Sequence, residues 1–244
     1  MDHPFAEPSD TRQAILGAAF RALCEHGYAN VTVQRIGDEF DKSPSLVYHH
    51  YDGKDELLID LLEFLLAEFE TSVAGENRPE LAGSGSPESA PAAFERSARE
   101  QIDAYLTATT DPGSVDDEYA PDARFFTVMT ELRAQAANNE AYREHFDRSD
   151  RVFGEYLEGI VRGAAAEIAA ADGAEDPADA GPAVGTVDPA EVAATLQTFA
   201  TGSTFRAATT AETEWVDGAR AGIDRYLETV LPLVDTGAAA SDEN

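Results

Sequence analysis

Apolar residues recur at helical spacing through most of the chain, and no stretch alternates between apolar and polar positions as a β-strand would. Two stretches interrupt the pattern and are predicted to be loops: residues 75–90, rich in Gly, Ser and Pro, and residues 171–189, rich in Ala, Asp, Gly and Pro. The expected fold class is therefore all-α. The pattern predicts helices over residues 10–27, 33–40, 43–51, 54–69, 91–109, 122–137, 139–170, 190–209 and 213–234.

Between Thr32 and Lys54 the pattern describes two short helices joined by a tight turn. In the second helix Ser43 is a suitable N-cap, and Pro44 suits the first helical position, where a missing N–H costs nothing. The apolar positions of this helix share one face, which leaves hydroxyl, imidazole and aromatic side chains on the opposite face. Such groups suit the base edges and phosphates of a DNA major groove, so this helix is the predicted reader of a helix-turn-helix.

The first predicted helix would complete an N-terminal three-helix domain. Asp10 is a plausible N-cap for it, and Gly27 suits a left-handed stop at its C-terminal end. The long helix that begins at residue 54 is apolar on more than one side and would link this domain to a larger C-terminal helical domain. We expect a helix-turn-helix domain over residues 1–53, a larger helical domain over 54–235 and an acidic tail over 236–244.

The composition at first argues against a nucleic-acid partner, because 17 basic and 47 acidic residues give a net charge of −30. Residues 10–54 reverse that argument, since they are nearly neutral and contain both lysines of the chain, Lys42 and Lys54. An acidic, lysine-poor surface resembles proteins of salt-accumulating halophiles, in which high salt screens self-repulsion. An ordinary acidic cytoplasmic protein is the alternative.

Further motifs surround the helix-turn-helix and occur in a fixed order over about residues 10–60. They are Ala14 to Leu23, His26-Gly27-Tyr28, Val31-Thr32-Val33, Val47 to Tyr51 and Lys54 to Leu58. Together they resemble the N-terminal domain of the TetR/AcrR family of transcriptional regulators. Phe40-Asp41-Lys42 stand where that family usually has a small residue, a glycine and an apolar residue.

The resemblance implies contacts with double-stranded operator DNA. Tyr48 and Lys54 would anchor phosphates without reading sequence, whereas Pro44, Ser45 and His49 would read base edges. The alternative for each is a solvated surface residue, and His50 could simply fill space behind the reader helix. The predicted DNA-binding residues are Thr32, Arg35, Lys42, Ser43, Pro44, Ser45, Tyr48, His49, His50 and Lys54.

The resemblance also implies a homodimer and an unidentified small-molecule effector. Aromatic and apolar residues of the central helices could line a ligand pocket, although stripes at helical spacing are more often plain core. The last two helices would form the dimer interface. The pocket candidates are Phe64, Phe94, Tyr105, Phe125, Phe126, Met129, Phe146, Phe153 and Tyr156, and the interface candidates are Phe199, Gly202, Phe205, Trp215 and Tyr226.

The remaining sequence signals are negative. No nucleotide-binding, nucleophile-elbow or zinc-ligand spacing is present, so we expect no enzyme activity, cofactor or metal. The N-terminus lacks the features of a signal peptide, and the most apolar segment, residues 57–69, is too short to span a bilayer, so we expect a cytoplasmic protein. The predicted function is a DNA-binding repressor released from a palindromic operator by a small molecule. A DNA-binding regulator without a ligand and a protein-interaction module that has lost operator binding are the alternatives.

Overall fold

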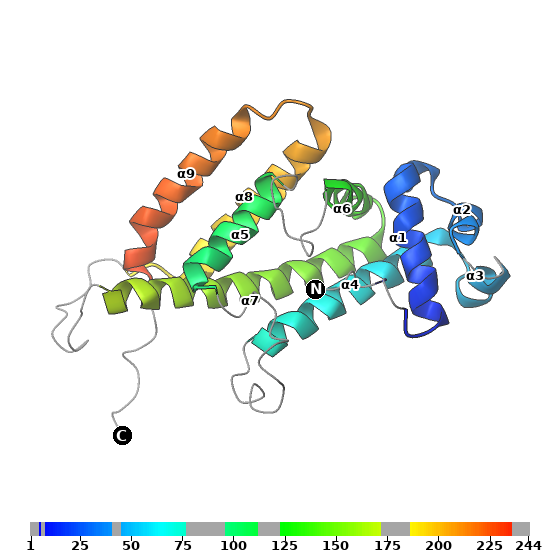
Figure 1. The fold of residues 1–244 in the computed structure, drawn as a ribbon, viewed down its shortest axis with the longest axis horizontal. Coiled ribbons are helices and arrows are strands. Elements are labelled where there is room, and N and C mark those ends of the chain that lie inside the picture. The colour runs from blue at the N-terminus through cyan, green and yellow to red at the C-terminus, as the bar shows by residue number, and fades with distance from the viewer. Residues whose placement is uncertain are drawn as a thin grey trace, which may run out of the picture. The chain divides into compact units, whose positions relative to one another are not determined.

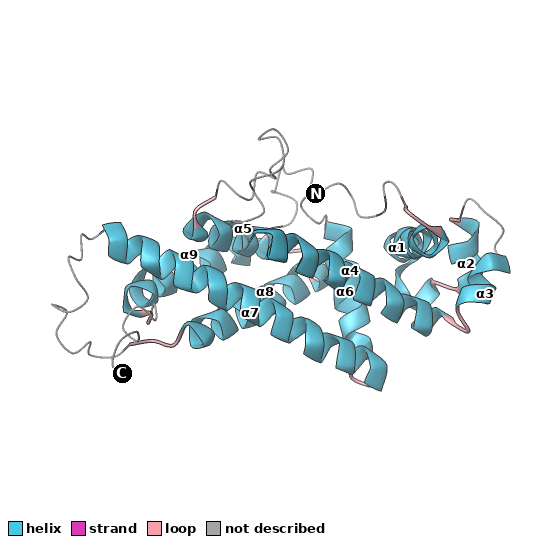
Figure 2. Cartoon of the chain, turned by 90° about the horizontal axis from the view of Figure 1, so that it is seen from below, coloured by secondary structure: helices cyan, strands magenta, loops and turns pink. Residues whose placement is uncertain are grey.

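In the residues that the computed structural model describes, the protein is built from helices (Figure 1, Figure 2). Those residues are 5, 8–40, 45–76, 96–111, 123–171 and 186–235. One isolated β-bridge, between Val187 and Val234, is the only strand-like pairing among them. The all-α fold class is confirmed. The elements are α1 (Thr11–Asn30), α2 (Val33–Asp38), α3 (Ser45–His50), α4 (Lys54–Glu76), α5 (Ala98–Thr110), α6 (Ala123–Gln135), α7 (Glu140–Ala171), α8 (Pro189–Thr209), α9 (Trp215–Val230) and the 3₁₀ turn η2 (Leu231–Leu233).

The observed helices lie close to the predicted ranges and differ mainly at their ends. The helix expected over residues 91–109 begins at Ala98, because Ser97 and Glu100 form a capping box in which each side chain bonds the other's backbone N–H. The predicted tail, residues 236–244, lies outside the described residues, and the predicted domain boundaries stay predictions.

The helices form two compact units, and the boundary between them falls inside α7, between Asp150 and Arg151. Unit 1 contains α1 to α4, α6 and the first part of α7, whereas unit 2 contains α5, the rest of α7, α8, α9 and η2. Each unit has its own hydrophobic core. None of the described helices combines the length and the hydropathy needed to cross a membrane.

Two local signals shape α1, the central helix of unit 1. The Asp10 carboxylate accepts the N–H of Gln13 at 2.8 Å and so caps the helix as its position predicts. Gly27 takes φ 69° and ψ 166°, which interrupts the helical path shortly before α1 ends. This positive φ is accessible because glycine has no Cβ, and the break turns the chain toward α2.

In unit 1, α1 packs against α2, α4 and α6, and α2 packs against α3 (Figure 1). Each helix contributes apolar side chains at helical spacing to one shared core, in which full burial of a large aliphatic side chain stabilises by about 1.5–3 kcal/mol. The most deeply buried members are Ile15, Leu16, Leu23, Ile36, Val47, Leu57, Leu58, Leu61, Leu62, Leu132 and Tyr142.

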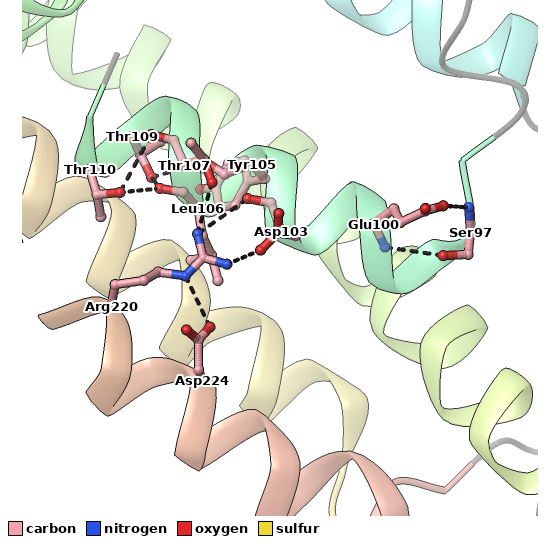
Figure 3. A network of polar contacts seen from close by, with 10 residues as sticks. All are labelled: Ser97, Glu100, Asp103, Tyr105, Leu106, Thr107, Thr109, Thr110, Arg220 and Asp224. Atoms are coloured by element: carbon pink, nitrogen blue, oxygen red, sulfur yellow. Dashed lines mark hydrogen bonds and ion pairs between the residues drawn. The ribbon is translucent and has the colours of Figure 1, made fainter. Parts of the chain in front are cut away.

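In unit 2, α5 packs against α8 and α9, and Arg220 fastens α9 to α5 (Figure 3). The Arg220 guanidinium donates to the Thr107 hydroxyl at 2.9 Å and forms an ion pair with Asp103, while its Nε donates to Asp224 at 3.0 Å. These charge-assisted bonds fix the register of α9 on α5. The apolar core beside them includes Ile102, Leu106, Leu157, Val161, Ala164, Val192, Leu196 and Leu227.

A short connection joins α8 to α9, which turns back toward the start of α8 (Figure 1). Contacts tie the pair at both ends. At the connection, the Arg206 guanidinium lies 4.7 Å from the centre of the Trp215 ring, whose Nε1 donates to the Glu212 carbonyl at 2.9 Å. At the other end, the Val187 N–H donates to the Leu233 carbonyl at 2.7 Å.

Candidate nucleic-acid interface

The start of α2 carries an exposed cation held by the preceding turn. The Thr32 hydroxyl accepts the N–H of Arg35 at 3.2 Å, so Thr32 is the N-cap of α2. Ile36, on the inner face, is fully buried. Arg35 is exposed, and its guanidinium donates to the Asn30 carbonyl at 2.6 Å. The bond to the backbone orients the guanidinium without neutralising it.

α3 presents one face to the core and the other to solvent. Val47 is fully buried, whereas Ser45, His49 and His50 are exposed and Tyr48 keeps 58% of its surface accessible. The structure thus places four predicted DNA contacts on the exposed part of one short helix. Three other candidates of this stretch lie outside the described residues: Lys42, Ser43 and Pro44.

Three residues, Arg12, Tyr51 and Asp60, fix the end of α3; we call them the Asp60 clamp. The Tyr51 hydroxyl donates to Asp60 of α4 at 2.6 Å, and Nε of Arg12, from the first turn of α1, donates to the same carboxylate at 2.8 Å. Burial, aided by the bond to Asp60, raises the pKa of Tyr51. Burial alone would raise the pKa of Asp60, but Arg12 and Tyr51 outweigh it and hold that pKa below its ordinary value.

Lys54, a predicted phosphate anchor, is held against the end of α1. Its ammonium donates to the Tyr28 carbonyl at 3.1 Å and lies 4.0 Å from the centre of the Tyr28 ring. The side chain is half-buried. These two contacts fix the position of the Lys54 ammonium. They also use part of its hydrogen-bonding capacity inside the protein.

The segment that includes the helix-turn-helix is shared with known regulators. Residues 15–61 match the family described as bacterial regulatory proteins of the tetR family. The N-terminal domain of the chain is thus similar to the DNA-binding domain of the tetR family. The match covers all of α2 and α3, most of α1 and the start of α4, so it contains every described residue of the exposed α3 face.

A curated relative matches the same N-terminal domain. The transcriptional repressor AcnR of Corynebacterium glutamicum is 38% identical over 55 residues, which is 22% of this chain and 29% of the relative. The chain thus matches less than a third of that relative's length, and the comparison concerns the N-terminal domain alone.

Solved structures extend the likeness to most of the chain. A TetR transcription regulator from Haloarcula marismortui has a TM-score of 0.61 at 26% identity, and the alignment covers 90% of this chain and 97% of the other. A transcriptional regulator from Saccharomonospora viridis, solved in complex with choline, has a TM-score of 0.56 at 20% identity and covers 89% and 95%. The second likeness concerns the fold alone.

Residues that hold the candidate interface in place include some that sequence reasoning missed. Arg12 and Asp60 lie 48 positions apart, and Glu131 of α6 reaches the backbone of Tyr28 over 103 positions. Helical spacing cannot connect residues so far apart. Tyr28 belongs to one of the family motifs, but its side-chain and backbone partners are visible only in the folded chain.

The predicted pocket residues are divided between the two units. Phe64 and Phe146 belong to the buried core of unit 1, where Phe64 packs against Phe5 with ring centroids 5.3 Å apart. Tyr105 and Tyr156 pack at the edge of the core of unit 2. The remaining candidates are Phe125, Phe126 and Met129 in unit 1 and Phe153 in unit 2, while Phe94 lies outside the described residues.

Within the described residues, no group of three or more His, Cys, Asp or Glu side chains is placed to hold a metal ion.

The predicted dimer residues fall into two groups. Phe205 is 60% exposed and Gly202 is also exposed, so both stand on the outer face of α8. Phe199 and Tyr226 pack in part against the core of unit 2, and Trp215 is half-buried beneath Arg206. The outer face of α8 is therefore the part of this set that is available to a second molecule.

Proposed function

We propose that the protein is a DNA-binding transcriptional regulator that acts as a homodimer. The observation that carries this proposal is the exposed face of α3 within a TetR-family domain. Ser45, Tyr48 and His49 supply the hydrogen-bonding groups that base edges and phosphates require. The Asp60 clamp holds the end of α3, so these groups would meet DNA in a fixed orientation.

The local charge supports a DNA partner despite the acidity of the whole chain. α3 contains no carboxylate, and Arg35 and Lys54 stand near its two flanks in the sequence. The N-terminus of α2, capped by Thr32, adds backbone N–H groups and a favourable helix dipole for a phosphate. Cations, the helix end and Tyr48 would bind phosphate, while Ser45 and His49 would select sequence.

The outer face of α8 supports the homodimer. Residues 192–211 contain one charged side chain, Arg206, in a chain of which 47 of 244 residues are acidic. Exposed Gly202 has open space around its Cα, which would allow a second helix to approach closely, and Phe205 offers an apolar anchor. A two-fold dimer would place two α3 helices on a palindromic operator, with half-sites about one helical turn, roughly 34 Å, or more apart.

We further propose that a small molecule releases the protein from its operator. The aromatic candidates of the central helices support a ligand, and the regulator from Saccharomonospora viridis with the same fold was solved with choline. Such a ligand would act only through different affinities for the DNA-bound and free conformations. The burial of Phe64 and Phe146 in the core of unit 1 favours the second candidate, a regulator without a ligand.

Selection from a pool of random duplexes tests the DNA-binding function. The purified full-length chain should enrich palindromic sequences in about 0.5–2 M KCl, where acidic self-repulsion is screened. Footprinting on an enriched sequence should then show two protected half-sites. Enrichment of no sequence would support the alternative of an interaction module that has lost operator binding.

A further inference from the structure

Tyr28 stands at a break in α1, and its backbone is held by a carboxylate from α6. Gly27, with φ 69°, turns the chain immediately before it. The Tyr28 N–H donates to Glu131 Oε2 at 2.6 Å. Both oxygens of Glu131 lie 3.1–3.2 Å from the place where a Cβ at position 27 would stand. A glycine at this position therefore serves two needs: it permits the turn, and it leaves room for the carboxylate.

The other polar groups of Tyr28 are bound by the first two residues of α4. Its carbonyl accepts from the Lys54 ammonium at 3.1 Å, and its ring lies beneath that ammonium. Its hydroxyl donates to Asp55 at 3.0 Å. The backbone and the side chain of Tyr28 thus fix the position of the start of α4. They also fix Lys54, the predicted phosphate anchor.

α7 completes this arrangement through Tyr142, which is fully buried. The Tyr142 hydroxyl donates to Asp55 at 3.2 Å, and its ring meets the Tyr28 ring edge-on, with centroids 6.4 Å apart. Burial is the main cause that raises the pKa of both tyrosines, so both hydroxyls stay protonated as donors at neutral pH. Four helices, α1, α4, α6 and α7, therefore meet at Tyr28; we call Tyr28, Lys54, Asp55, Glu131 and Tyr142 the Tyr28 junction.

We propose that Glu131 is a positioning residue for DNA binding, which fixes the start of α2 and the Lys54 ammonium through the Tyr28 junction. Thr32, the N-cap of α2, follows Tyr28 by only four residues, and Lys54 bonds to Tyr28 directly. A shift of Glu131 moves the Tyr28 backbone and with it the start of α2 and the Lys54 ammonium. The inference rests on the proposed function, because it concerns DNA affinity.

The charge of Glu131 gives the proposal a sharp test, because electrostatics alone predicts the opposite result. Removing a carboxylate from an acidic protein lessens its repulsion from DNA and should tighten binding slightly. Glu144, exposed on α7 in the same unit, is the matched control. We expect Glu144→Ala to bind a selected operator as tightly as the wild type or slightly more tightly. We expect Glu131→Ala to bind it about tenfold more weakly, since a charge-assisted hydrogen bond is lost.

Glu131→Gln distinguishes positioning from general damage to the fold. It keeps an oxygen acceptor but not the charge, so its loss of operator affinity should be smaller than that of Glu131→Ala, about threefold. Thermal melts of both variants measure global stability alongside the binding. Equal affinity of Glu131→Ala, Glu131→Gln and Glu144→Ala, with all three folded, would overturn the proposal.

Amide hydrogen exchange separates failure of this inference from failure of the proposed function. In Glu131→Ala, residues 28–38 and 45–54 should exchange about tenfold faster, while α8 and α9 keep wild-type rates. If amide exchange near Tyr28 is unchanged in Glu131→Ala, the proposed role of Glu131 in the Tyr28 junction is wrong, whatever the DNA selection finds. Faster exchange in a protein that enriches no DNA would refute DNA binding and the positioning role for it, and would leave Glu131 a purely structural contact.

Discussion

Two exposed helix faces of the protein, on α3 and on α8, contrast in chemistry. The α3 face offers a hydroxyl, two imidazoles and the phenol of Tyr48, which is 58% exposed. The α8 face offers threonines and small residues around Phe205, which is 60% exposed. No carboxylate stands along α3, and none stands between Glu191 and Glu212, the stretch that contains most of α8. By contrast, about a fifth of the residues of the whole chain are acidic.

Two properties of an exposed face are informative in an acidic protein: whether it carries carboxylates, and which other chemical groups it presents. The absence of carboxylates indicates that a face is reserved for a partner, because elsewhere on this chain exposed positions are rich in Asp and Glu. The atoms that remain indicate which partner fits. Hydrogen-bonding groups on α3 match base edges and phosphates. Apolar and small groups on α8 gain nothing from DNA but exclude water well against a second copy of the same helix.

A charge introduced by substitution on the α8 face should have the largest effect, which is on the stability of the dimer. Phe205→Glu would bury a carboxylate in the proposed dimer interface, so we expect the dimer to dissociate at least about 100-fold more readily. Sedimentation velocity measures this change. Ala141→Glu, which adds the same charge at an exposed position of α7, should leave the dimer intact. A wild-type monomer that binds one half-site tightly would contradict the assignment of this face.

Changes on the α3 face should have smaller effects that depend on the DNA sequence. Ser45→Ala or His49→Ala should cost about 1–3 kcal/mol on the selected operator and relax preference at one or two base pairs. Tyr48→Phe, which removes a phosphate donor, should weaken binding to all sequences alike. Competition between operator and random duplexes measures both quantities. Equal losses on both kinds of DNA for all three variants would remove the distinction between readers and anchors.

The sequence was most informative where local signals decide the structure. Helical spacing located the helices, Asp10 was correctly expected as an N-cap, and the positive φ of Gly27 followed from its place after an apolar stripe. Each of these depends on a few neighbouring residues. The same holds for the exposure of Ser45, Tyr48 and His49, because burial of Val47 fixes which face of α3 is turned outward.

Contacts between distant segments could not be predicted in the same way. Phe5 precedes the first predicted helix, yet it is buried against Phe20 and Phe64. Gly17 makes room for it, since a Cβ at position 17 would lie 3.0 Å from that of Phe5. Nothing in the spacing of one helix reveals which distant side chain will fill such a gap, and the same is true of Glu131 at Gly27.

The Asp60 clamp should make the α3 face sensitive to acid, with a moderate effect. The folded pKa of Asp60 is depressed, so its contribution to stability is fully present above its unfolded pKa, near 4. That contribution is lost as the pH falls through the lower folded value. Asp60→Asn should therefore cost about 1–2 kcal/mol of unfolding free energy at neutral pH, allowing for solvent screening, and progressively less in acid.

Asp147→Asn, an exposed change on α7, is the control for the loss of one charge. Urea unfolding of the wild type and both variants between about pH 3 and 7 checks the expectation. The gap between wild type and Asp60→Asn should narrow as the pH falls, while Asp147→Asn should follow the wild type throughout. A gap that is constant with pH would show that the clamp acts through packing rather than through the ionised carboxylate.

The smallest effect we expect is that of salt on operator affinity. Each phosphate contact by a cation normally steepens the loss of affinity with salt, by a log–log slope of about −0.9. Near α3 the described cations are few, with Arg35 and Lys54 the main ones, and Lys54 already bonds to Tyr28. The rest of the chain carries nearly all of the net charge of −30 and repels the duplex.

These two contributions respond oppositely to salt, which is why they should nearly cancel. At 0.01 M the Debye length is about 30 Å, so the acidic body repels DNA from a distance, whereas at 1 M it is about 3 Å and only local contacts remain. A titration from about 0.1 to 2 M KCl should therefore give a shallow or inverted slope, and the free protein should partly unfold in dilute buffer. Arg35→Ala should shift the slope further in the positive direction, because one cation contact is lost. A steep, monotonic loss like that of a basic repressor would mean that contact cations dominate, and that the carboxylate-free α3 face alone does not decide how this protein meets DNA.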